Sequence, residues 1–394
     1  MRCIVSAQTL YKNLQKLQGV IQANPLSPII ENFLFDIQDR NLTLLATDLN
    51  TTLTTRMNVE AHGSMRIAVP SRFLLETLKS LGEQPVTLNM NETSYSISMS
   101  TDSGDYQLLG EDPAAFPVLT EPEELHQAFT MPAHAFLEGL NHTMFAVSTD
   151  EIRVAMVGVL VDMDSTGVHF AATDGHKLAT HSCHIMGPEI PGKFILPRKA
   201  VQLLRSLLSD ISGDVTIRFD KSNAYFNFGE TELTCRLIDA RFPDYKSVIP
   251  VGNEYKLVIS RQNLLNCLRR TSLYANKSTY LIRVTLAGSE LKVVSEDSDL
   301  SSHAQESIAC SWDGPDMSMG FNGRTFIEML SNLSCDQVLM RLNSPNKPGL
   351  ISPAEPDPAY SVKDRVEIEG DPTASEESFE GTGQLVGERL EPGN

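Results

Sequence analysis

IVSAQTLYKNLQKLQGVI, at residues 4–21, has two counterparts further along the chain: FTMPAHAFLEGLNHTMFAV at 129–147 and LVISRQNLLNCLRRTSLYA at 257–275. Each has a short apolar run, then Ser or Pro, then apolar residues at helical spacing. This pattern predicts a strand followed by an amphipathic helix. Ser caps a helix N-terminus and Pro suits the first helical turn, so exchanging them keeps one physical role. The matching positions are spaced 126 and 128 residues apart: Ser6, Pro132 and Ser260.

A second set of segments repeats at nearly the same spacing. IAVPSRFLLETLKSL at 67–81, FILPRKAVQLLRSLL at 194–208 and MGFNGRTFIEMLSNL at 319–333 again predict a strand, a break and a helix. The breaks lie 127 and 125 residues apart, at Pro70, Pro197 and Asn322.

A third set predicts pairs of strands joined by an acidic turn. It comprises LTLLATDLNTTL at 42–53, VHFAATDGHKLAT at 168–180 and LKVVSEDSDLSSH at 291–303. Its aspartates are 126 and 123 residues apart: Asp48, Asp174 and Asp297. Phe116-Pro117 also recurs 126 residues later as Phe242-Pro243, and the third repeat lacks this pair.

The period of these four sets decides the architecture. It is far longer than the roughly 20–50 residues of solenoid repeats, so the sequence predicts three tandem copies of one whole domain. Each copy has two helices and several alternating strands, which predicts an α+β fold with helices packed on antiparallel sheets. The expected domains are 1–126, 127–253 and 254–360. Residues 361–394 are rich in Glu, Pro, Gly and Ser, which predicts an acidic, disordered tail.

Composition excludes several classes of protein. No apolar run approaches the ~18 residues of a membrane-spanning helix, and the N-terminus lacks the apolar region of a signal peptide. The six cysteines are scattered without a C-x-x-C pair, which argues against a zinc ribbon and a disulfide scaffold. Walker A, GxSxG and helix-preceding GxGxxG motifs are missing. We therefore expect a cytoplasmic protein without catalytic residues, metal or cofactor.

Basic residues are concentrated on the predicted helices although the net charge is −18. Together the six helices carry +8, and they are expected at 7–22, 71–81, 133–147, 198–209, 260–274 and 323–333. One interpretation is that Lys and Arg are good helix formers that merely decorate helices. The other is that the helices share a face that meets a polyanion. Glu forms helices equally well yet is nearly missing from them, which favours the second interpretation.

The chain resembles the bacterial DNA sliding clamp, the β subunit of the replicative DNA polymerase III, from residue 1 to about 360. The resemblance rests on TDL at 47–49, TDGHKLA at 173–179, PRKAV at 197–201, RFPDYKSVIP at 241–250 and GFN at 320–322. It implies that two protomers join head to tail into a ring of six domains, with helices lining a hole that duplex DNA threads without sequence specificity. It also implies a clamp loader that hydrolyses ATP, whereas the clamp itself is not an enzyme.

Site residues follow from the resemblance position by position. Lys and Arg on the helices would face phosphates, and Asn24 stands where relatives can carry Arg. The DNA-facing set is Lys12, Lys16, Asn24, Arg72, Lys79, Arg198, Lys199, Arg205, Arg269 and Arg270. The homodimer would join domain 1 of one protomer to domain 3 of the other through Tyr106, Leu108, Leu273 and Tyr274. The alternative is that these four are ordinary core residues of their own domains.

The resemblance also implies a hydrophobic pocket for short peptides of the replicative polymerase, the clamp loader and other partners. Its residues would be Met156, Thr173, Gly175, His176, Lys177, Leu178, Pro243, Val248, Ser361 and Val362. Ser247 stands where relatives can carry Arg, and Lys363, Asp364 and Arg365, which follow Val362, are polar. The tail would either be inert or compete for this groove.

Two other functions fit parts of the sequence. One is a monomeric three-domain scaffold that binds peptides without encircling DNA. The other is a hydrolase in which Asp174 orients His176 as a base. Against the hydrolase, both residues lie in a predicted Asp-Gly hairpin, where turn geometry already accounts for Asp and Gly. Asp48, Asp174 and Asp297 would sit in separate domains and cannot converge on one metal ion.

Overall fold

Helices form where apolar residues recur at helical spacing, and they begin where the sequence predicts. In the computed structural model, which describes residues 1–22, 27–117, 128–184, 191–355 and 365–368, the α-helices are α1 (Ala7–Gln18), α2 (Ser71–Ser80), α3 (Ala133–Thr143), α4 (Arg198–Leu208), α5 (Tyr245–Val248), α6 (Arg261–Thr271) and α7 (Gly323–Ser331). Short 3-10 helices are η1 (Pro28–Glu31), η2 (Pro113–Ala115), η3 (Met144–Ala146), η4 (Val154–Met156) and η5 (Ser272–Tyr274).

Caps explain the helix starts. Ser6 Oγ accepts a hydrogen bond from the Thr9 amide at 3.3 Å, and Ser260 Oγ accepts one from the Asn263 amide at 3.4 Å. Pro132 immediately precedes α3 rather than lying in its first turn, so the predicted role of this proline is shifted by one residue.

Three helices end three or four residues earlier than predicted. The first was expected to reach residue 22 but stops at Gln18, with Gly19 at its C-cap. The helices expected to reach 147 and 274 end at Thr143 and Thr271, and each continues as a 3-10 turn. A tighter last turn satisfies backbone carbonyls that the α-helix leaves unpaired, which is a common ending that periodicity does not reveal.

Strands make up most of the remaining structure. In the first repeat they are β1 (Arg2–Ser6), β2 (Asn32–Gln38), β3 (Asn41–Thr47), β4 (Thr51–Asn58), β5 (Glu60–Ala61), β6 (Ser64–Pro70), β7 (Pro85–Met90), β8 (Ser96–Ser100) and β9 (Asp105–Leu109). In the second they are β10 (Phe129–Pro132), β11 (Gly158–Asp164), β12 (Gly167–Thr173), β13 (Lys177–Cys183), β14 (Gly192–Pro197), β15 (Asp214–Phe219), β16 (Asn223–Phe228) and β17 (Thr231–Arg236). The third has β18 (Tyr255–Ser260), β19 (Leu281–Ala287), β20 (Glu290–Asp297), β21 (Ser302–Ala309), β22 (Ser311–Trp312), β23 (Met317–Asn322), β24 (Gln337–Leu342), β25 (Gly349–Pro353) and β26 (Arg365–Ile368).

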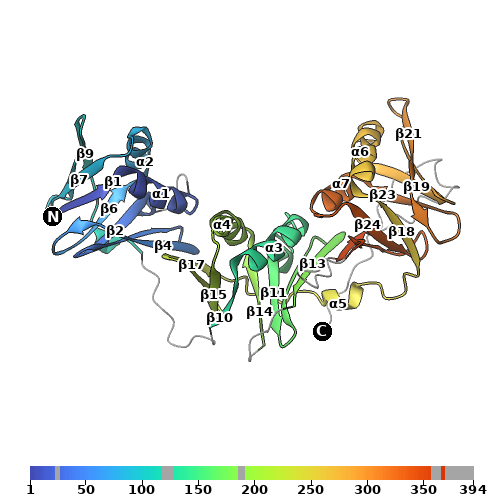
Figure 1. The fold of residues 1–394 in the computed structure, drawn as a ribbon, viewed down its shortest axis with the longest axis horizontal. Coiled ribbons are helices and arrows are strands. Elements are labelled where there is room, and N and C mark those ends of the chain that lie inside the picture. Colours follow the sequence, from blue (N-terminus) through green and yellow to red (C-terminus); the bar gives the residue numbers. More distant parts are fainter. Residues whose placement is uncertain (23–26, 118–127, 185–190, 356–364, 369–394) are drawn as a thin grey trace. The chain divides into compact units, whose positions relative to one another are not determined.

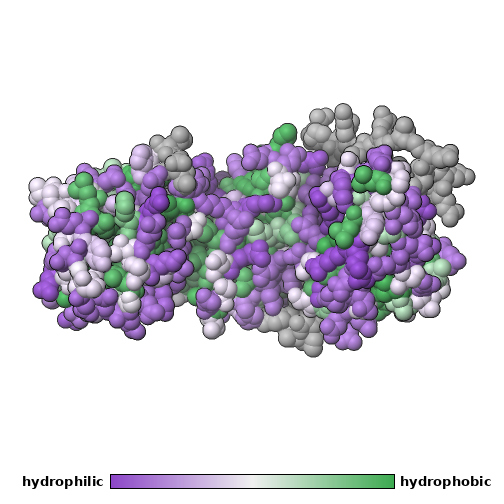
Figure 2. All heavy atoms as spheres, turned by 90° about the horizontal axis from the view of Figure 1, so that it is seen from above, coloured by the Kyte–Doolittle hydropathy of each residue, from purple (hydrophilic) through white to green (hydrophobic). Residues whose placement is uncertain are grey.

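Contacts divide the chain into two compact units. Unit 1 comprises residues 1–172 and 182–243, and unit 2 comprises residues 173–181 and 244–394. In unit 1, helices α1 to α4 lie on one side of the strands, and in unit 2 α6 and α7 lie side by side (Figure 1). Hydrophilic residues cover most of the surface seen in Figure 2, with smaller apolar patches between them.

Unit 1 holds a five-stranded sheet in the order β5-β1-β7-β8-β9 and an eight-stranded sheet in the order β10-β15-β16-β17-β4-β3-β2-β6. The second sheet joins two repeats, because β4 of the first pairs antiparallel with β17 of the second. In unit 2, β21-β20-β19-β23 form one sheet, and β13 pairs antiparallel with β26. The strands β9 and β21 each lie at the edge of their sheet.

β26 lies in the segment for which a disordered tail was expected. Residues 365–368 pair with β13 on one side and β25 on the other. Two flanking strands satisfy the backbone groups of this segment, and composition does not reveal such pairing. The remaining tail residues, 361–364 and 369–394, lie outside the described part of the chain.

The cores are built from the apolar faces that the periodicity marks. Leu10, Leu14 and Leu17 of α1 are fully buried, and burying each contributes about 1.5–3 kcal/mol. In the second repeat, Phe136 packs against Phe170 with ring centroids 5.2 Å apart. A Cβ at Gly139 would approach the Phe170 ring to 2.3 Å, so this helix position requires glycine.

Candidate functional site

The acidic turns of the three repeats have one geometry. In each, the aspartate Oδ1 accepts hydrogen bonds from the backbone amides two and three residues later. Asp48 receives them from Asn50 and Thr51, Asp174 from His176 and Lys177, and Asp297 from Asp299 and Leu300. Gly175 has a φ of +90°, which confirms the predicted Asp-Gly hairpin. One oxygen of each aspartate is thus used in its own turn, and the other is left for a partner.

Lys199 provides that partner for Asp48. The Lys199 Nζ donates to Asp48 Oδ2 at 2.5 Å and to the Val20 carbonyl at 2.8 Å, and Gln22 Nε2 also donates to Asp48 Oδ2. The Asp48 side chain is only 3% exposed, so its charge requires this compensation. The lysine lies on α4 of the second repeat and the aspartate follows β3 of the first. This ion pair therefore joins two repeats, a role that sequence reasoning missed.

In unit 2, the partner of Asp174 is Lys177, which lies in the same turn. Its Nζ lies 3.1 Å from Asp174 Oδ2 and 2.7 Å from Glu328 Oε2 on α7. Burial alone would lower the pKa of Lys177, but the hydrogen bond to Glu328 and the charge of Asp174 outweigh it and raise the pKa. The lysine therefore stays charged and tied to two carboxylates. Asp174 is likewise occupied on both oxygens, which removes the base-orienting role required of it in a hydrolase.

Helix cations fall into two groups. The exposed group is Lys12, Lys16, Arg72, Lys79 and Arg269. Lys12 and Lys16 are four residues apart and therefore share one face of α1. In the other group the cations bond within the protein: Arg198 donates to the Val147 carbonyl at 2.9 Å, and Arg205 donates to Asn141 Oδ1 at 2.5 Å. The predicted Asn24 lies outside the described residues.

Arg270 also has a strong internal partner. Its guanidinium donates two hydrogen bonds to Glu306 of β21, at 2.8 and 2.6 Å. This bidentate contact lowers the pKa of the Glu306 carboxyl, chiefly through the hydrogen bonds from Arg270. Of the predicted phosphate contacts, Lys199, Arg198, Arg205 and Arg270 are therefore less available than the exposed group, because each already holds a position in the fold.

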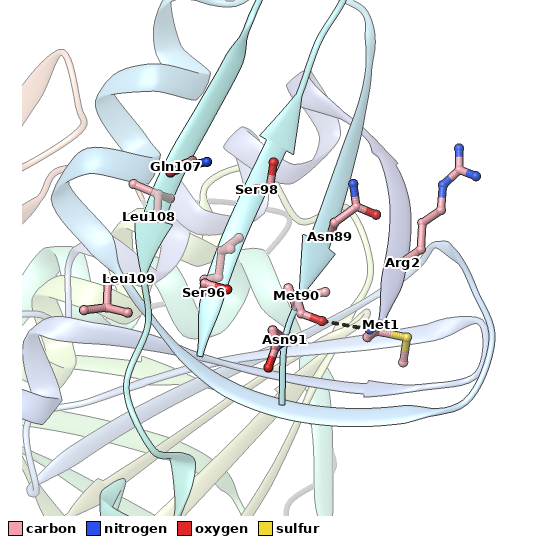
Figure 3. A pocket seen from close by; sticks show the side chains of 11 residues that line it. Met1, Arg2, Asn89, Met90, Asn91, Ser96, Ser98, Gln107, Leu108 and Leu109 are labelled. Carbon is pink, nitrogen blue, oxygen red and sulfur yellow. Dashed lines mark hydrogen bonds between the residues drawn. The ribbon is translucent and has the colours of Figure 1, made fainter. Parts of the chain in front are cut away.

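Three of the predicted dimer residues are exposed in the protomer. Leu273 is 69%, Tyr274 47% and Tyr106 36% exposed, which excludes the alternative that they are core residues of their own domains. Leu108 is half-buried on the edge strand β9. The surface is hollowed next to it, and Figure 3 shows Leu108 and Leu109 at one side of this hollow and Asn89 and Arg2 at the other. Phe73 on α2 is also 66% exposed, although sequence reasoning did not single it out.

The predicted peptide-binding residues divide between the two units. Met156 and Pro243 belong to unit 1, and both are half-buried. Unit 2 holds exposed Gly175 and His176 and buried Leu178, together with Thr173, Lys177 and the 45% exposed Val248. Ser361 and Val362 lie outside the described residues.

Over residues 1–22, 27–117, 128–184, 191–355 and 365–368, no group of three His, Cys, Asp or Glu side chains could hold a metal ion. In the same part of the chain, no helix is long and apolar enough to cross a membrane.

Comparison with known proteins supports one family along nearly the whole chain. The beta sliding clamp of Pseudomonas putida is 27% identical over 376 residues, which cover 92% of this chain and 98% of the relative. That of Pseudomonas aeruginosa is 28% identical over 369 residues, with 92% and 99% covered.

Solved structures agree. A DnaN sliding clamp from P. aeruginosa, bound to griselimycin, matches with a TM-score of 0.89 at 25% identity, covering 94% of this chain and 99% of that one. A DnaN sliding clamp from Bartonella birtlesii matches with a TM-score of 0.85 at 28% identity and the same coverage.

Domain models of the DNA polymerase III beta subunit match in order: the N-terminal domain at residues 1–120, the central domain at 130–244 and the C-terminal domain at 246–363. These matches follow the three repeats found in the sequence. The chain belongs to the family of the DNA polymerase III beta subunit, the bacterial β sliding clamp.

Proposed function

We propose that two copies of this chain close head to tail into a ring around duplex DNA. As a sliding clamp, the chain is a processivity factor of the replicative DNA polymerase. The observation that carries the ring is the pairing of equivalent strands between repeats. β4 of the first repeat pairs with β17 of the second, and β13 of the second pairs with β26 of the third.

Among the described strands, one of each kind, β21 and β9, has no partner strand from another repeat. β21 occupies the place of β4 and β13 in the third repeat, because it follows the third acidic turn. β9 occupies the place of β17 in the first repeat, because it is the last strand after the second helix. Both are edge strands. Pairing β21 of one copy with β9 of another repeats the internal junctions and closes a ring of two copies.

The side chains of β9 support this arrangement. Counting along paired strands places Tyr106 at the position of Leu233, and Leu108 at that of Cys235. Leu233 and Cys235 are both fully buried at the junction of the first two repeats. Tyr106 and Leu108 would be covered in the same way once β21 of a second copy pairs with β9.

A ring allows weak contacts with DNA to suffice. Exposed cations such as Lys12, Lys16 and Arg269 attract phosphates by a sequence-independent mechanism, and nothing needs to read base edges. Acidic residues elsewhere repel DNA from other surfaces. The ring is held by topology and moves freely along the duplex.

We further propose the remaining partners and the place of action. The residues that bind apolar peptides of the polymerase, the clamp loader and other replication proteins include Met156 and Pro243 of unit 1 and His176 and Val248 of unit 2. The loader supplies ATP hydrolysis, and the clamp performs no catalysis. Replication takes place in the cytoplasm at the nucleoid and involves no membrane.

Retention on DNA tests the ring. The protein is loaded with its clamp loader and ATP onto nicked circular DNA, and half of the sample is linearised. We expect the clamp to stay on circles and to run off linear DNA, because only a topological link depends on DNA ends. A clamp with proven loading on the same DNA serves as the control. Equal loss from both forms would contradict the ring and favour the monomeric peptide-binding scaffold.

A further inference from the structure

The third acidic turn contains a buried carboxylate with an unused oxygen. Asp297 is 5% exposed, and its Oδ1 accepts the amides of Asp299 and Leu300. Within the part of the chain that the structure describes, no hydrogen bond or ion pair reaches Asp297 Oδ2, whereas Lys199 reaches the same oxygen of Asp48 and Lys177 that of Asp174. Asp297 Oδ2 is not one of the fully buried unpaired atoms of the described residues, so it is accessible at the surface to a cation from another chain.

The junction of the first two repeats indicates where that partner would come from, whereas Asp174 is paired by Lys177 of its own turn and the third turn has no lysine at that position. Lys199 lies two residues after Pro197, at the start of the second helix of its repeat, and Arg72 lies two residues after Pro70, at the same place in the first repeat. Asp48 is bound by a cation on the second helix of the following repeat. In a head-to-tail ring, the repeat that follows the third is the first repeat of the second copy.

The third repeat also contains an equivalent of the Val20 carbonyl, the second group that Lys199 binds. Lys199 binds the Val20 carbonyl, 14 residues after Ser6, and the residue 14 after Ser260 is Tyr274. Ser302 pairs with Asp297 across the strands, and its Oγ donates to the Tyr274 carbonyl at 3.2 Å. Ser302 thus brings the Tyr274 carbonyl to the turn that contains Asp297.

Arg72 is free to make such a contact. Among the residues that the structure describes, its ion-pair partner is Glu76 on its own helix, at 3.3 Å, and the two side chains are 85% and 68% exposed. An exposed pair of this kind contributes little stability and is readily exchanged. A guanidinium has donors in a planar fork, so it can bind a carboxylate and a carbonyl together.

We propose that Arg72 of one copy binds Asp297 and the Tyr274 carbonyl of the other, as a positioning contact that completes the dimer junction. The proposal rests on the proposed ring and specifies the ion pair that closes it. It moves Arg72 from the predicted DNA-facing set to the dimer interface. Each ring contains two copies of this contact. Losing it therefore reduces the free energy of dimerisation at both junctions.

A double-mutant cycle tests the pair by sedimentation equilibrium of the full chain. Arg72→Ala and Asp297→Asn are each expected to raise the dimer dissociation constant at least about tenfold, because each leaves a charge unpaired at a closed junction. Asn retains the Oδ1 acceptor of the turn, so the fold is preserved. The dimer dissociation constant of the double variant should be little higher than that of the single variant that dimerises more weakly, which is the signature of a direct contact. Lys79→Ala, on the same helix, and Asp299→Asn, in the same turn, are controls that should leave dimerisation unchanged.

Charge reversal gives a second test. Arg72→Glu and Asp297→Lys should each dimerise poorly alone, yet mixing the two should restore dimers, since both junctions of the mixed ring then carry opposite charges. The proposed pair is overturned if the effects of the two single substitutions add in the cycle. It is also overturned if the mixture stays monomeric although both variants unfold as cooperatively as the unmodified chain. If the unmodified chain is itself monomeric, the proposed ring is wrong and the pair falls with it.

Discussion

Replacing Leu273 and Tyr274 by alanine is expected to convert dimers into monomers. These residues are 69% and 47% exposed in the 3-10 turn that follows α6. The repeat places them where Gly19 and Val20 lie at the junction of the first two repeats, and Val20 is fully buried there. Covering them in the dimer would bury two large apolar side chains at each of two junctions.

The expected size of this effect is large. Truncating a central interface residue costs about 2 kcal/mol or more, and the ring contains four such side chains. We expect the dimer dissociation constant to rise by more than about a thousandfold, measured by light scattering or sedimentation. Because the side chains are exposed in the protomer, its thermal unfolding should hardly change.

A matched control separates the interface from general surface effects. Val251 is also an apolar residue of unit 2 and is fully exposed. Val251→Ala should leave the dimer intact. A dimer that persists at low concentration with both Leu273 and Tyr274 replaced would show that this turn is not part of the interface.

The architecture was predictable because the evidence for it is repeated. A single Asp-Gly turn or a single amphipathic segment is weak evidence, but four sets of segments at nearly one period leave little room for another fold. Ser6 and Ser260 cap their helices as their residue type predicts, and the aspartates of the three turns make the same hydrogen bonds. At these positions, the preference of the residue type for a cap or turn agrees with the position that the repeat assigns to it.

The partners of individual charges could not be predicted in the same way. Lys199 was expected to face DNA because it is a cation on a helix, yet it binds Asp48, 151 residues away in the chain. Arg270 likewise binds Glu306, 36 residues away. Such pairs depend on which side chains the fold brings together. Composition gives the sign of a helix charge but not whether that charge is already neutralised.

The alignment of the repeats contains a signal for one such contact. It places Lys199 and Arg72 at equivalent positions, and it places Asp48 and Asp297 at equivalent positions as well. A known contact in one pair then predicts a contact in the other. β26 carries only a short signal, because Arg365 and Glu367 alternate with Val366 and Ile368 over four residues of a segment whose composition predicts disorder. Its order comes from backbone pairing with β13 and β25.

Replacing Met156 and His176 by alanine is expected to remove most binding of a polymerase-derived peptide. Met156 is half-buried at the end of η4, and its flexible thioether suits varied apolar anchors. His176 is exposed beside Gly175, in a turn that Asp174 and Lys177 hold in place. Its ring is therefore presented from a rigid support, and removing it loses contact area without disturbing the turn.

Affinity should fall at least about a hundredfold, since losing two contacts at the centre of a small interface costs about 3 kcal/mol or more. A labelled peptide with apolar anchors, titrated while its fluorescence anisotropy is followed, measures this directly. Ile152→Ala is the matched control, because Ile152 is 90% exposed near Met156 in the chain and was not placed in the peptide site. The double variant should still dimerise and stay on circular DNA, so that peptide binding alone is lost. Unaltered affinity would show that the peptide binds elsewhere, whereas loss of both dimer and peptide would point to a disturbed fold.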